Sequence, residues 1–363
     1  MRIGQISPLF ESVPPRCYGG TERVVHYLTE ELVRRGHDVV LFASGDSCTS
    51  AELFASVPES LRQAGYCGDP MAPELIQVDV VADLWDRFDI LHFHTGPSHY
   101  PLMSRMPVAH LTTMHGPLDV PGQRELYNRF NQIPLVSISE SQRQPLPDAN
   151  WLGTVYHGLP LDLYTPDYSP DNYLAFVGRV SPQKRLDRAI AIATELGLPL
   201  KVAAKIDSTE EAYYKETIEP LLVDNPLVEF LGEIDDAGKQ ELLSKSLALL
   251  FPIDWEEPFG LVMIEANACG TPVIAWRNGA TPEVIRQGIN GILVDSVAEA
   301  VAAVRMIERL DRKVVRRDFE KRFSITRVAQ QYERLYGHQI QAQSDRGMKR
   351  PGVLTHELLI HAT

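Results

Sequence analysis

The sequence predicts an α/β protein of two doubly wound domains, each built on a mainly parallel sheet. Three observations carry this prediction. The chain has 363 residues, which suits two domains of about 150 to 200 residues each. Strand and helix patterns alternate in two successive series, as they do in Rossmann-like domains. An irregular stretch rich in Pro, Asp and Tyr, residues 140–172, separates the two series and marks a domain boundary.

The first series begins with a buried strand at residues 2–6 and a loop at 7–20 that is rich in Pro and Gly. Apolar residues then recur at helical spacing from Val24 to Val33, and Gly36 is suited to end that helix. Further strands are expected at 39–43, 89–94, 108–113 and 135–139. These elements predict a first Rossmann-like domain over residues 1–160.

The second series begins with a strand at residues 173–180, followed by Ser181-Pro182, which is typical of a helix start. An apolar stripe runs from Leu186 to Leu196, and Gly197 ends it. The alternation continues with strands at 200–204, 227–231, 247–252 and 272–276, and with helices near 209–223, 235–246, 259–269, 296–310 and 311–322. We therefore expect a second domain over 161–324, a last helix over 325–340 that packs back toward the first domain, and a loosely held tail over 341–363.

Composition limits the partners and the compartment. Lys and Arg number 35 against 48 Asp and Glu, so the net charge is −13, which argues against nucleic acid as a partner. The four cysteines form no C-x-x-C pair, as expected of free thiols in a reducing compartment. No signal-peptide pattern opens the chain, and its longest apolar run, 247–253, is far shorter than the ~20 residues of a membrane span. We expect a cytoplasmic protein.

The first candidate binding motif, Tyr18-Gly19-Gly20-Thr21-Glu22, lies between the first strand and the first helix. Its glycines permit close approach of a ligand, and a helix N-terminus offers free N–H groups and the positive end of the helix dipole. The motif predicts an anion site, with a tight loop of ordinary glycines as the alternative. It is not a G-x-G-x-x-G fingerprint, and the chain carries no Walker A lysine signature.

The second motif, Gly178-Arg179-Val180-Ser181-Pro182-Gln183-Lys184, places two cations where a strand is expected to end. Arg donates a fork of hydrogen bonds and Lys acts as a point charge, a pair suited to a diphosphate. The alternative is a pair of solvated surface cations. The position favours binding, because ligands of doubly wound domains lie at the carboxyl ends of strands.

The third motif carries two carboxylates, Glu257 and Glu265, around Pro258-Phe259-Gly260. Pro258 suits the first turn of a helix, which would place Glu257 just before the helix and Glu265 about two turns inside it. That spacing suits contacts to two parts of one long ligand and is too wide for a shared proton. A buried Glu265 would need a partner. The alternative is an exposed polar stripe on an amphipathic helix.

Together these motifs resemble the retaining glycosyltransferases of family 4, whose GT-B fold sets two Rossmann-like domains across a cleft. The resemblance covers about residues 1–338. It departs from the family at Asn278-Gly279, where Gly-Gly is frequent, at His157, where Asn is common, and in the short first domain. It rests on Gly178-Arg179-x4-Lys184, Glu257-Pro-Phe-Gly-Leu-x3-Glu265 and Gly279-x2-Pro282-Glu283, and more weakly on Gly19-Gly20-Thr21-Glu22, Asp89-x2-His92-x-His94, Thr113-x-His115 and the stretch 157–166.

The resemblance implies a donor site built from both domains. Arg179 and Lys184 would hold the donor diphosphate, and Glu265 would bind the ribose hydroxyls. Glu257 would contact the donor sugar, and His115 would contact it near the reacting carbon. The predicted catalytic residues are therefore His115, Arg179, Lys184 and Glu257. The predicted donor-binding residues are Gly20, Arg179, Lys184, Leu231, Gly232, Glu257, Phe259, Gly260, Leu261 and Glu265, with Leu231 and Gly232 near the base.

The expected activity is transfer of a sugar from a nucleotide-diphosphate sugar to a hydroxyl acceptor, with retention at the sugar carbon. We expect a front-face reaction in which the acceptor attacks as the diphosphate leaves and a phosphate oxygen takes the proton. Neither a metal nor another cofactor is expected, because Arg179, Lys184 and the helix N-terminus near Gly260 can neutralise the leaving charge. The alternatives are a nucleotide-sugar epimerase of the same fold and a non-catalytic sugar-nucleotide-binding protein. The motifs set neither the donor and acceptor nor the oligomeric state.

Two further clusters have competing interpretations. Five histidines, His92, His94, His99, His110 and His115, suggest a metal, but no carboxylate or cysteine completes a ligand pattern, so a core or cleft role is preferred. The basic run over residues 312–322 is interpreted as a solvated helix face, with weak peripheral contact to an anionic membrane as the second interpretation.

Overall fold

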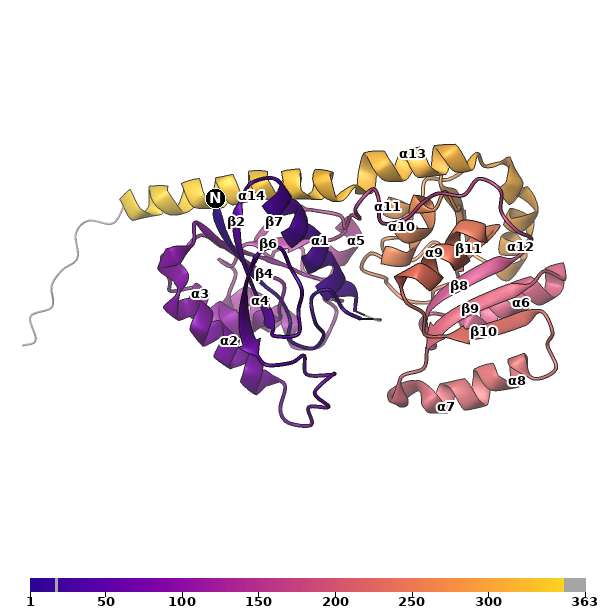
Figure 1. The fold of residues 1–363 in the computed structure, drawn as a ribbon, viewed down its shortest axis with the longest axis horizontal. Helices are drawn as coiled ribbons and strands as arrows, with labels where there is room; N and C mark the ends of the chain where they lie inside the picture. The colour runs from indigo at the N-terminus through magenta and orange to yellow at the C-terminus, as the bar shows by residue number, and fades with distance from the viewer. Residues whose placement is uncertain (17–18, 349–363) are drawn as a thin grey trace, which may run out of the picture.

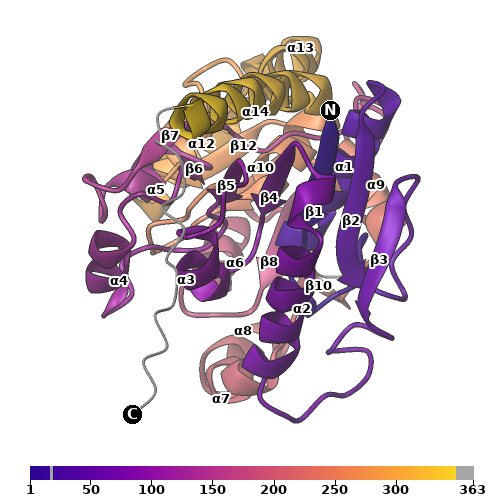
Figure 2. The ribbon, with the colours of Figure 1, turned by 90° about the vertical axis from the view of Figure 1, so that its left-hand side faces the viewer.

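Two parallel sheets organise the chain, with helices packed against them (Figures 1 and 2). The computed structural model describes residues 1–16 and 19–348. The first sheet has the strand order β3 (Glu52–Val57), β2 (Asp38–Ser44), β1 (Arg2–Ile6), β4 (Ile90–Phe93), β5 (His110–Thr113), β6 (Leu135–Ser137), β7 (Trp151–Thr154). The second has the order β10 (Val228–Gly232), β9 (Leu200–Lys205), β8 (Leu174–Arg179), β11 (Ala248–Phe251), β12 (Val273–Trp276), β13 (Gly291–Val294). The α/β fold class predicted from the two series is confirmed.

The strand order of each sheet reverses beside its first strand in the sequence. β1 pairs with both β2 and β4, and β8 pairs with both β9 and β11. A crevice forms at such a switch point, outside the carboxyl ends of the strands. The helices of the first half are α1 (Gly20–Arg34), α2 (Met71–Asp83), α3 (Tyr100–Met103), α4 (Gln123–Arg129) and α5 (Glu140–Arg143). The two loops that leave β1 and β8 are therefore placed to meet a ligand.

The later helices of the chain follow the strands of the second sheet, whose core combines aliphatic and aromatic side chains. β11 and β12 are buried along their whole length, as expected of central parallel strands with both faces covered. The helices are α6 (Leu186–Leu196), α7 (Glu211–Tyr213), a π-helical turn (Tyr214–Ile218), α8 (Glu219–Leu222), α9 (Asp236–Lys245), α10 (Leu261–Ala268), α11 (Thr281–Val284), α12 (Val297–Met306), α13 (Arg312–Phe323) and α14 (Ile325–Met348).

Two predicted helix starts are wrong. Ser181-Pro182 does not begin a helix, because the chain makes a turn in which Ser181 O accepts from Lys184 N, and α6 starts only at Leu186 after Arg185 adopts φ 53°. Pro258 likewise precedes its helix, because Gly260 at the N-cap has φ 85° and α10 starts at Leu261. Glu265 consequently lies about one turn inside α10 instead of two.

Several short or exposed elements escaped the sequence pattern. The irregular stretch 140–172 contains β7, which pairs with β6, and the sheet's other edge is β3, which is half-exposed along its length. β13 has only four residues. α2 carries apolar residues around most of its circumference and so lacks the one-sided spacing that indicates a helix. The conformation of these elements depends more on the neighbouring strands and helices than on their own sequence.

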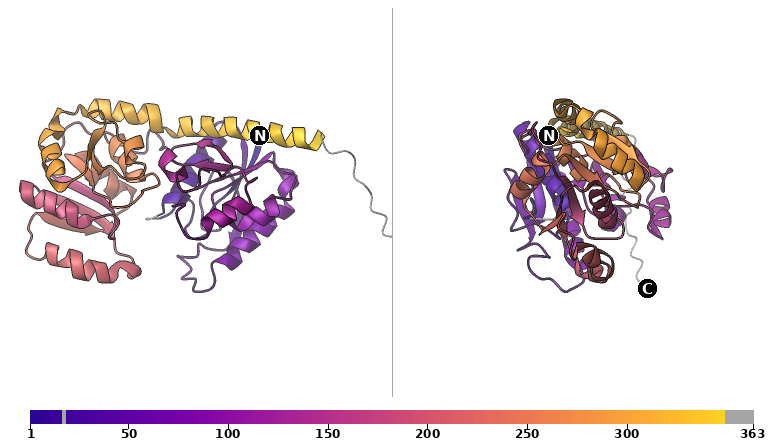
Figure 3. Two further views of the ribbon diagram at one scale, coloured as in Figure 1. Left: turned by 180° about the vertical axis from the view of Figure 1, so that it is seen from behind. Right: turned by 90° about the vertical axis from the view of Figure 1, so that its right-hand side faces the viewer.

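The last helix is longer than expected and returns to the first domain (Figure 3). α14 extends to Met348, so the prediction of a tail is wrong for residues 341–348, and the rest of that segment lies outside the described residues. Its packing partners are α1, β4 and β5. The chain passes between the domains at two places that pair with each other: Leu159 N donates to Phe323 O, and Ile325 N donates to Leu159 O, both at 2.9 Å. No helix among residues 1–16 and 19–348 has the length and apolarity to cross a membrane.

The basic run of α13 binds the protein itself. The Arg312 guanidinium donates to Asp167 O, Ser246 O and Ser244 O at 2.7–2.8 Å, and Arg316 donates to Leu161 O, Tyr164 O and Ala268 O at 2.5–2.9 Å. Both arginines are buried. The interpretation of a solvated face is therefore wrong for these two residues, while Lys313, Arg317 and Lys321 are exposed. The membrane interpretation stays a prediction.

We expect Arg316→Met to lower the free energy of unfolding by about 2 to 4 kcal/mol, because three buried carbonyl oxygens lose a charged donor. Arg317→Met removes the same charge from the exposed neighbouring position and should change stability by less than about 0.5 kcal/mol. Urea denaturation of both variants measures the difference. Equal losses in the two variants would contradict a structural role for Arg316.

Candidate functional site

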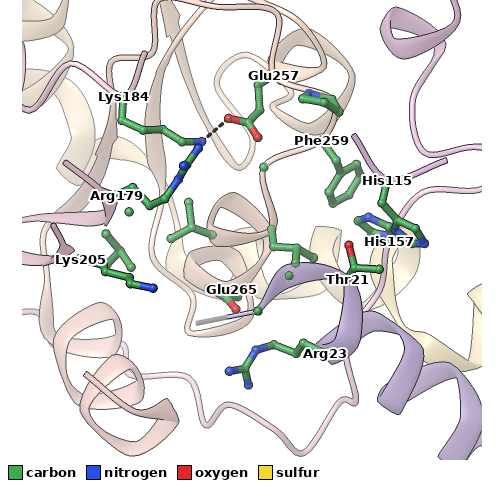
Figure 4. A pocket seen from close by; sticks show the side chains of 18 of the residues that line it. Thr21, Arg23, His115, His157, Arg179, Lys184, Lys205, Glu257, Phe259 and Glu265 are labelled. Carbon is green, nitrogen blue, oxygen red and sulfur yellow. Dashed lines mark hydrogen bonds and ion pairs between the residues drawn. The ribbon is translucent and has the colours of Figure 1, made fainter. Parts of the chain in front are cut away.

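A pocket between the two domains collects almost every residue that the motifs indicate (Figure 4). Gly20 and His115 line it from the first domain, and the residues of the second domain face them. Those residues are Arg179, Lys184, Glu257, Phe259, Gly260, Leu261 and Glu265. Leu231 and Gly232 at the end of β10 do not line this pocket, and Leu231 is largely exposed. Their contact with a base stays a prediction. Tyr18 of the first motif lies outside the described residues.

Two helices begin side by side at the pocket. α1 starts at Gly20 and α10 starts at Leu261, and both residues line the pocket. A Cβ added to Gly20 would lie 3.7 Å from Leu261 Cδ1, so the first turns of the two helices are close neighbours. Each helix presents free N–H groups and the positive end of its dipole. The two N-termini therefore add positive partial charge to this part of the pocket.

Lys184 and Glu257 form an ion pair on the wall opposite α1 (Figure 4). The Trp255 indole donates to the same carboxylate at 2.9 Å, and Lys184 Nζ lies 5.3 Å from the centroid of that indole ring. Lys184 and Glu257 side chains are only 14% and 11% exposed, so each needs the other for charge compensation. The turn at residues 181–184, which replaces the expected helix start, is what carries Lys184 to Glu257.

Arg179 stands beside this pair at the end of β8 (Figure 4). Its guanidinium lies 3.8 Å from Asp207, a loose contact, and Lys205 approaches the same carboxylate at 3.2 Å. Arg179 Nε is buried without a hydrogen-bond partner among the described residues. The three cations Arg179, Lys184 and Lys205 consequently gather on one wall, which suits a ligand with more than one negative charge.

Glu265 is 4% exposed, which rules out the exposed-stripe interpretation. Its carboxylate accepts from Lys239 Nζ at 2.9 Å, and Lys239 also lies 3.4 Å from Asp236. Asp236 in turn pairs with Arg23 of α1, so the chain of charges crosses from the second domain to the first. Lys239 and Arg23 were missed by the sequence analysis, because neither belongs to a recognisable motif. The one available signal was that a buried Glu265 needs a charged or hydrogen-bonding partner.

The histidines form a buried polar cluster under the other wall. His115 stacks on His157 with ring centroids 5.3 Å apart, and His157 meets the Phe259 ring edge-to-face at 4.9 Å. Burial lowers the pKa of His115 to about 3, so the ring is neutral at physiological pH. His92 is hydrogen-bonded to Tyr336 and Thr113, and His94 is hydrogen-bonded to Gln5 and His115. Among the described residues no group of three or more His, Cys, Asp or Glu side chains is arranged to hold a metal.

A second contact between the domains uses Glu283 of the Gly279-x2-Pro282-Glu283 motif. The Glu283 carboxylate accepts from the backbone N–H groups of Glu140 and Ser141, both at 2.8 Å, and from the Tyr156 hydroxyl at 2.9 Å. The carboxylate of the second domain therefore caps the first turn of α5 in the first domain. Together with Arg23–Asp236, this contact sets the spacing of the pocket walls.

Comparison with known proteins agrees with this architecture. The family model described as "Glycosyltransferase Family 4" matches residues 18–143, and the model described as "Glycosyl transferases group 1" matches residues 165–323. Between them the two models account for most of both domains. The chain belongs to the family 4 glycosyltransferases.

Individual relatives are distant. The N-acetyl-alpha-D-glucosaminyl L-malate synthase of Bacillus anthracis is 26% identical over 369 residues, covering 88% of this chain and 95% of that protein. The D-inositol 3-phosphate glycosyltransferase of Mycolicibacterium smegmatis is 26% identical over 216 residues, and the match spans only 49% of that protein's length. The structure of HepE from Anabaena, solved with UDP and glucose, has a TM-score of 0.71 at 19% identity and covers 93% of this glycosyltransferase and all of that chain. The fold is that of the GT-B enzymes.

Proposed function

We propose that this glycosyltransferase transfers a sugar from a nucleoside-diphosphate sugar to a hydroxyl acceptor with retention of configuration and without a metal ion. The observation that supports the proposal most strongly is one pocket that brings Arg179 and Lys184 together with two helix N-termini and two separately paired carboxylates. A structural neighbour, HepE, is described in complex with UDP and glucose. The charges in the pocket suit such a ligand in this chain too.

The proposed roles follow from the geometry. The diphosphate would lie between the cationic wall and the first turns of α1 and α10, which stabilise the charge that develops as the bond to the sugar breaks. Lys184 is already held against Glu257, so it would bridge the phosphate and the carboxylate that contacts the sugar. Glu265, held beside Lys239, would accept hydrogen bonds from the ribose.

Retention is proposed to arise on one face of the sugar. The acceptor oxygen forms its bond to the anomeric carbon as the bond to the phosphate oxygen breaks, and the acceptor's proton passes to that phosphate oxygen. Glu257 and Glu265 are each held by a lysine, which suits hydrogen bonding better than nucleophilic attack. NMR of the product's anomeric proton measures retention, and a sugar–enzyme adduct trapped with a fluorinated donor would contradict this mechanism.

The donor class is tested by a thermal-shift screen of UDP-, GDP- and ADP-sugars, followed by assays of donor hydrolysis and transfer with and without EDTA. We expect stabilisation by at least one donor and activity unchanged by EDTA. Failure of every donor to bind would overturn the main proposal, strict dependence on Mg²⁺ would overturn its metal-free form, and a product that is itself an isomeric nucleotide sugar would make the protein an epimerase.

The ribose contact predicts the effect of Glu265→Gln. Loss of the carboxylate charge removes a charged hydrogen bond, which should raise the donor Kd by about 10- to 100-fold. The control is Glu308→Gln, an exposed carboxylate away from this pocket. Isothermal titration with the donor found in the screen measures both values. An unchanged Kd in Glu265→Gln would remove the assignment.

A further inference from the structure

A hydrogen-bonded chain of buried side chains connects the last helix with the pocket. Gln5 on β1 donates from Nε2 to the hydroxyl of Tyr336 on α14 at 3.0 Å. The amide oxygen of Gln5 lies 2.8 Å from His94 Nε2. His94 Nδ1 lies 2.9 Å from His115 Nε2, and His115 lines the pocket. The chain thus runs Tyr336–Gln5–His94–His115 and joins α14, β1 and the ends of two neighbouring strands.

Every member of this chain is uncharged, and all but His115, which is partly exposed at the pocket, are buried. Gln5 and Tyr336 are fully buried and His94 is 4% exposed. Burial holds the pKa of His94 well below its usual value, and that of His115 is lowered to about 3. A neutral imidazole has one N–H donor and one bare nitrogen that accepts. Each ring in the chain therefore has a definite polarity, which its neighbours determine.

The polarity follows from the Gln5 amide. Its carbonyl oxygen can only accept, so the proton between it and His94 belongs to His94 Nε2. His94 Nδ1 is then bare and accepts from His115 Nε2–H. His115 Nδ1 is in consequence the bare nitrogen of that ring. It is buried and has no hydrogen-bond partner among the described residues, although its ring forms part of the pocket wall.

We propose that Gln5, His94 and Tyr336 are positioning residues that hold His115 in the tautomer whose Nδ1 accepts a hydrogen bond. The group received at this point of the pocket is then a hydroxyl of the transferred sugar; a carbonyl or phosphate oxygen has no hydrogen to give. The statement that this hydroxyl belongs to the transferred sugar rests on the proposed function, whereas the tautomer of His115 does not. In this proposal α14 contributes to the site, because the Tyr336 hydroxyl orients the Gln5 amide, which in turn sets the tautomers of His94 and His115.

The tautomer is measured in the native protein, without any ligand, by long-range proton–nitrogen NMR of ¹⁵N-histidine-labelled enzyme. Protonated and bare ring nitrogens have well-separated shifts, and His115→Gln assigns the signals of His115. We expect Nε2 to be protonated and Nδ1 to be bare. A proton on Nδ1 of His115 would overturn the proposal outright.

Two variants of similar shape test the relay itself. Gln5→Met keeps the side-chain length but removes the acceptor of His94 Nε2–H, and it should put a detectable proton population on His115 Nδ1. Gln77→Met is the matched control, because Gln77 is also a fully buried glutamine, but its amide donates to Ser7 O, outside the relay. It should leave His115 unchanged. An unchanged tautomer in Gln5→Met, or an equal change in Gln77→Met, would overturn the proposal.

In the transfer reaction the same pair separates positioning from folding. Gln5→Met should lower kcat about tenfold, the cost of one misdirected hydrogen bond, and should leave KM for the donor within about threefold. Gln77→Met should keep both constants. Absence of any transferase activity in the native protein would refute the proposed function and leave the tautomer measurement standing as the test of the relay.

Discussion

Lys184→Met is expected to lower kcat by about 10²- to 10³-fold, the usual effect of removing one charged group from a site where negative charge develops. Lys184 pairs with Glu257 in the pocket, and its side chain is only 14% exposed, so water cannot replace its charge efficiently. Methionine keeps the aliphatic stem against the rings of Phe251 and Trp255. Steady-state kinetics on the identified donor measure the loss.

The variant should also be less stable by about 1 to 3 kcal/mol, because Glu257 keeps only the Trp255 indole as a partner. Lys245→Met is the control: Lys245 pairs with Asp167 at 2.7 Å, is 43% exposed and does not line the pocket. It should retain full activity. If Lys184→Met kept its kcat while losing stability, the lysine would be a structural partner of Glu257 only, and the diphosphate assignment would fail.

The residues of the pocket between the domains were predictable because they belong to motifs at the ends of strands. Arg179 ends β8, and Lys184 and Glu257 follow β8 and β11 in chain order, so parallel strand topology delivers them to one edge. The same reasoning placed Gly20 at the start of α1. The local sequence therefore predicts well which loops lie at the carboxyl edge of each sheet.

The partners of those residues were not predictable in the same way. Lys239 compensates Glu265 from a different helix, and Arg312 and Arg316 donate to carbonyls that lie up to about 150 residues earlier in the chain. Such contacts depend on how α9 and α13 pack, and nothing in a helical window distinguishes a buried guanidinium from a solvated one. Positive φ at Arg185 likewise stopped a helix that its sequence favours.

The histidine cluster lies between these cases. Alternation along β4 places His92 and His94 on one face, but only the arrival of α14 supplies Tyr332 and Tyr336 to satisfy the cluster. The hydrogen bonds of these histidines therefore depend on a helix near the C-terminal end of the chain, which a local reading of the first domain does not include.

Gly279→Ala is expected to damage both the stability and the activity of the second domain. Gly279 has φ 55°, and an added Cβ would fall well inside van der Waals contact of the backbone N and O of Glu257. Those atoms belong to a main chain that is itself anchored, since Ala280 N donates to Glu257 O at 2.9 Å and Gly279 N donates to Glu256 at 3.0 Å. The collision cannot be relieved by a side-chain rotation.

Two costs add in this variant. A left-handed backbone costs a residue with a Cβ about 1 to 2 kcal/mol, and forcing backbones apart costs about 1 to 3 kcal/mol more. The displacement also moves the Glu257 carboxylate away from Lys184. We expect kcat to fall by at least about tenfold, which corresponds to the loss of one hydrogen bond from the transition state. Asn278 is not expected to be the source of this sensitivity, because its side chain is held by a hydrogen bond to Ile253 O at 3.0 Å.

Gly288→Ala separates the two costs. Gly288 has a comparable φ of 74°, yet a Cβ there would meet nothing within 4 Å. Urea denaturation should show a loss of about 1 to 2 kcal/mol for Gly288→Ala, with kinetics unchanged, and a clearly larger loss for Gly279→Ala. If both variants lost the same stability and both stayed fully active, the contact between Gly279 and the Glu257 backbone would have no part in holding the carboxylate. A larger loss in Gly279→Ala, together with a fall in kcat, would show that the main chain at Gly279 determines the position of the Glu257 carboxylate.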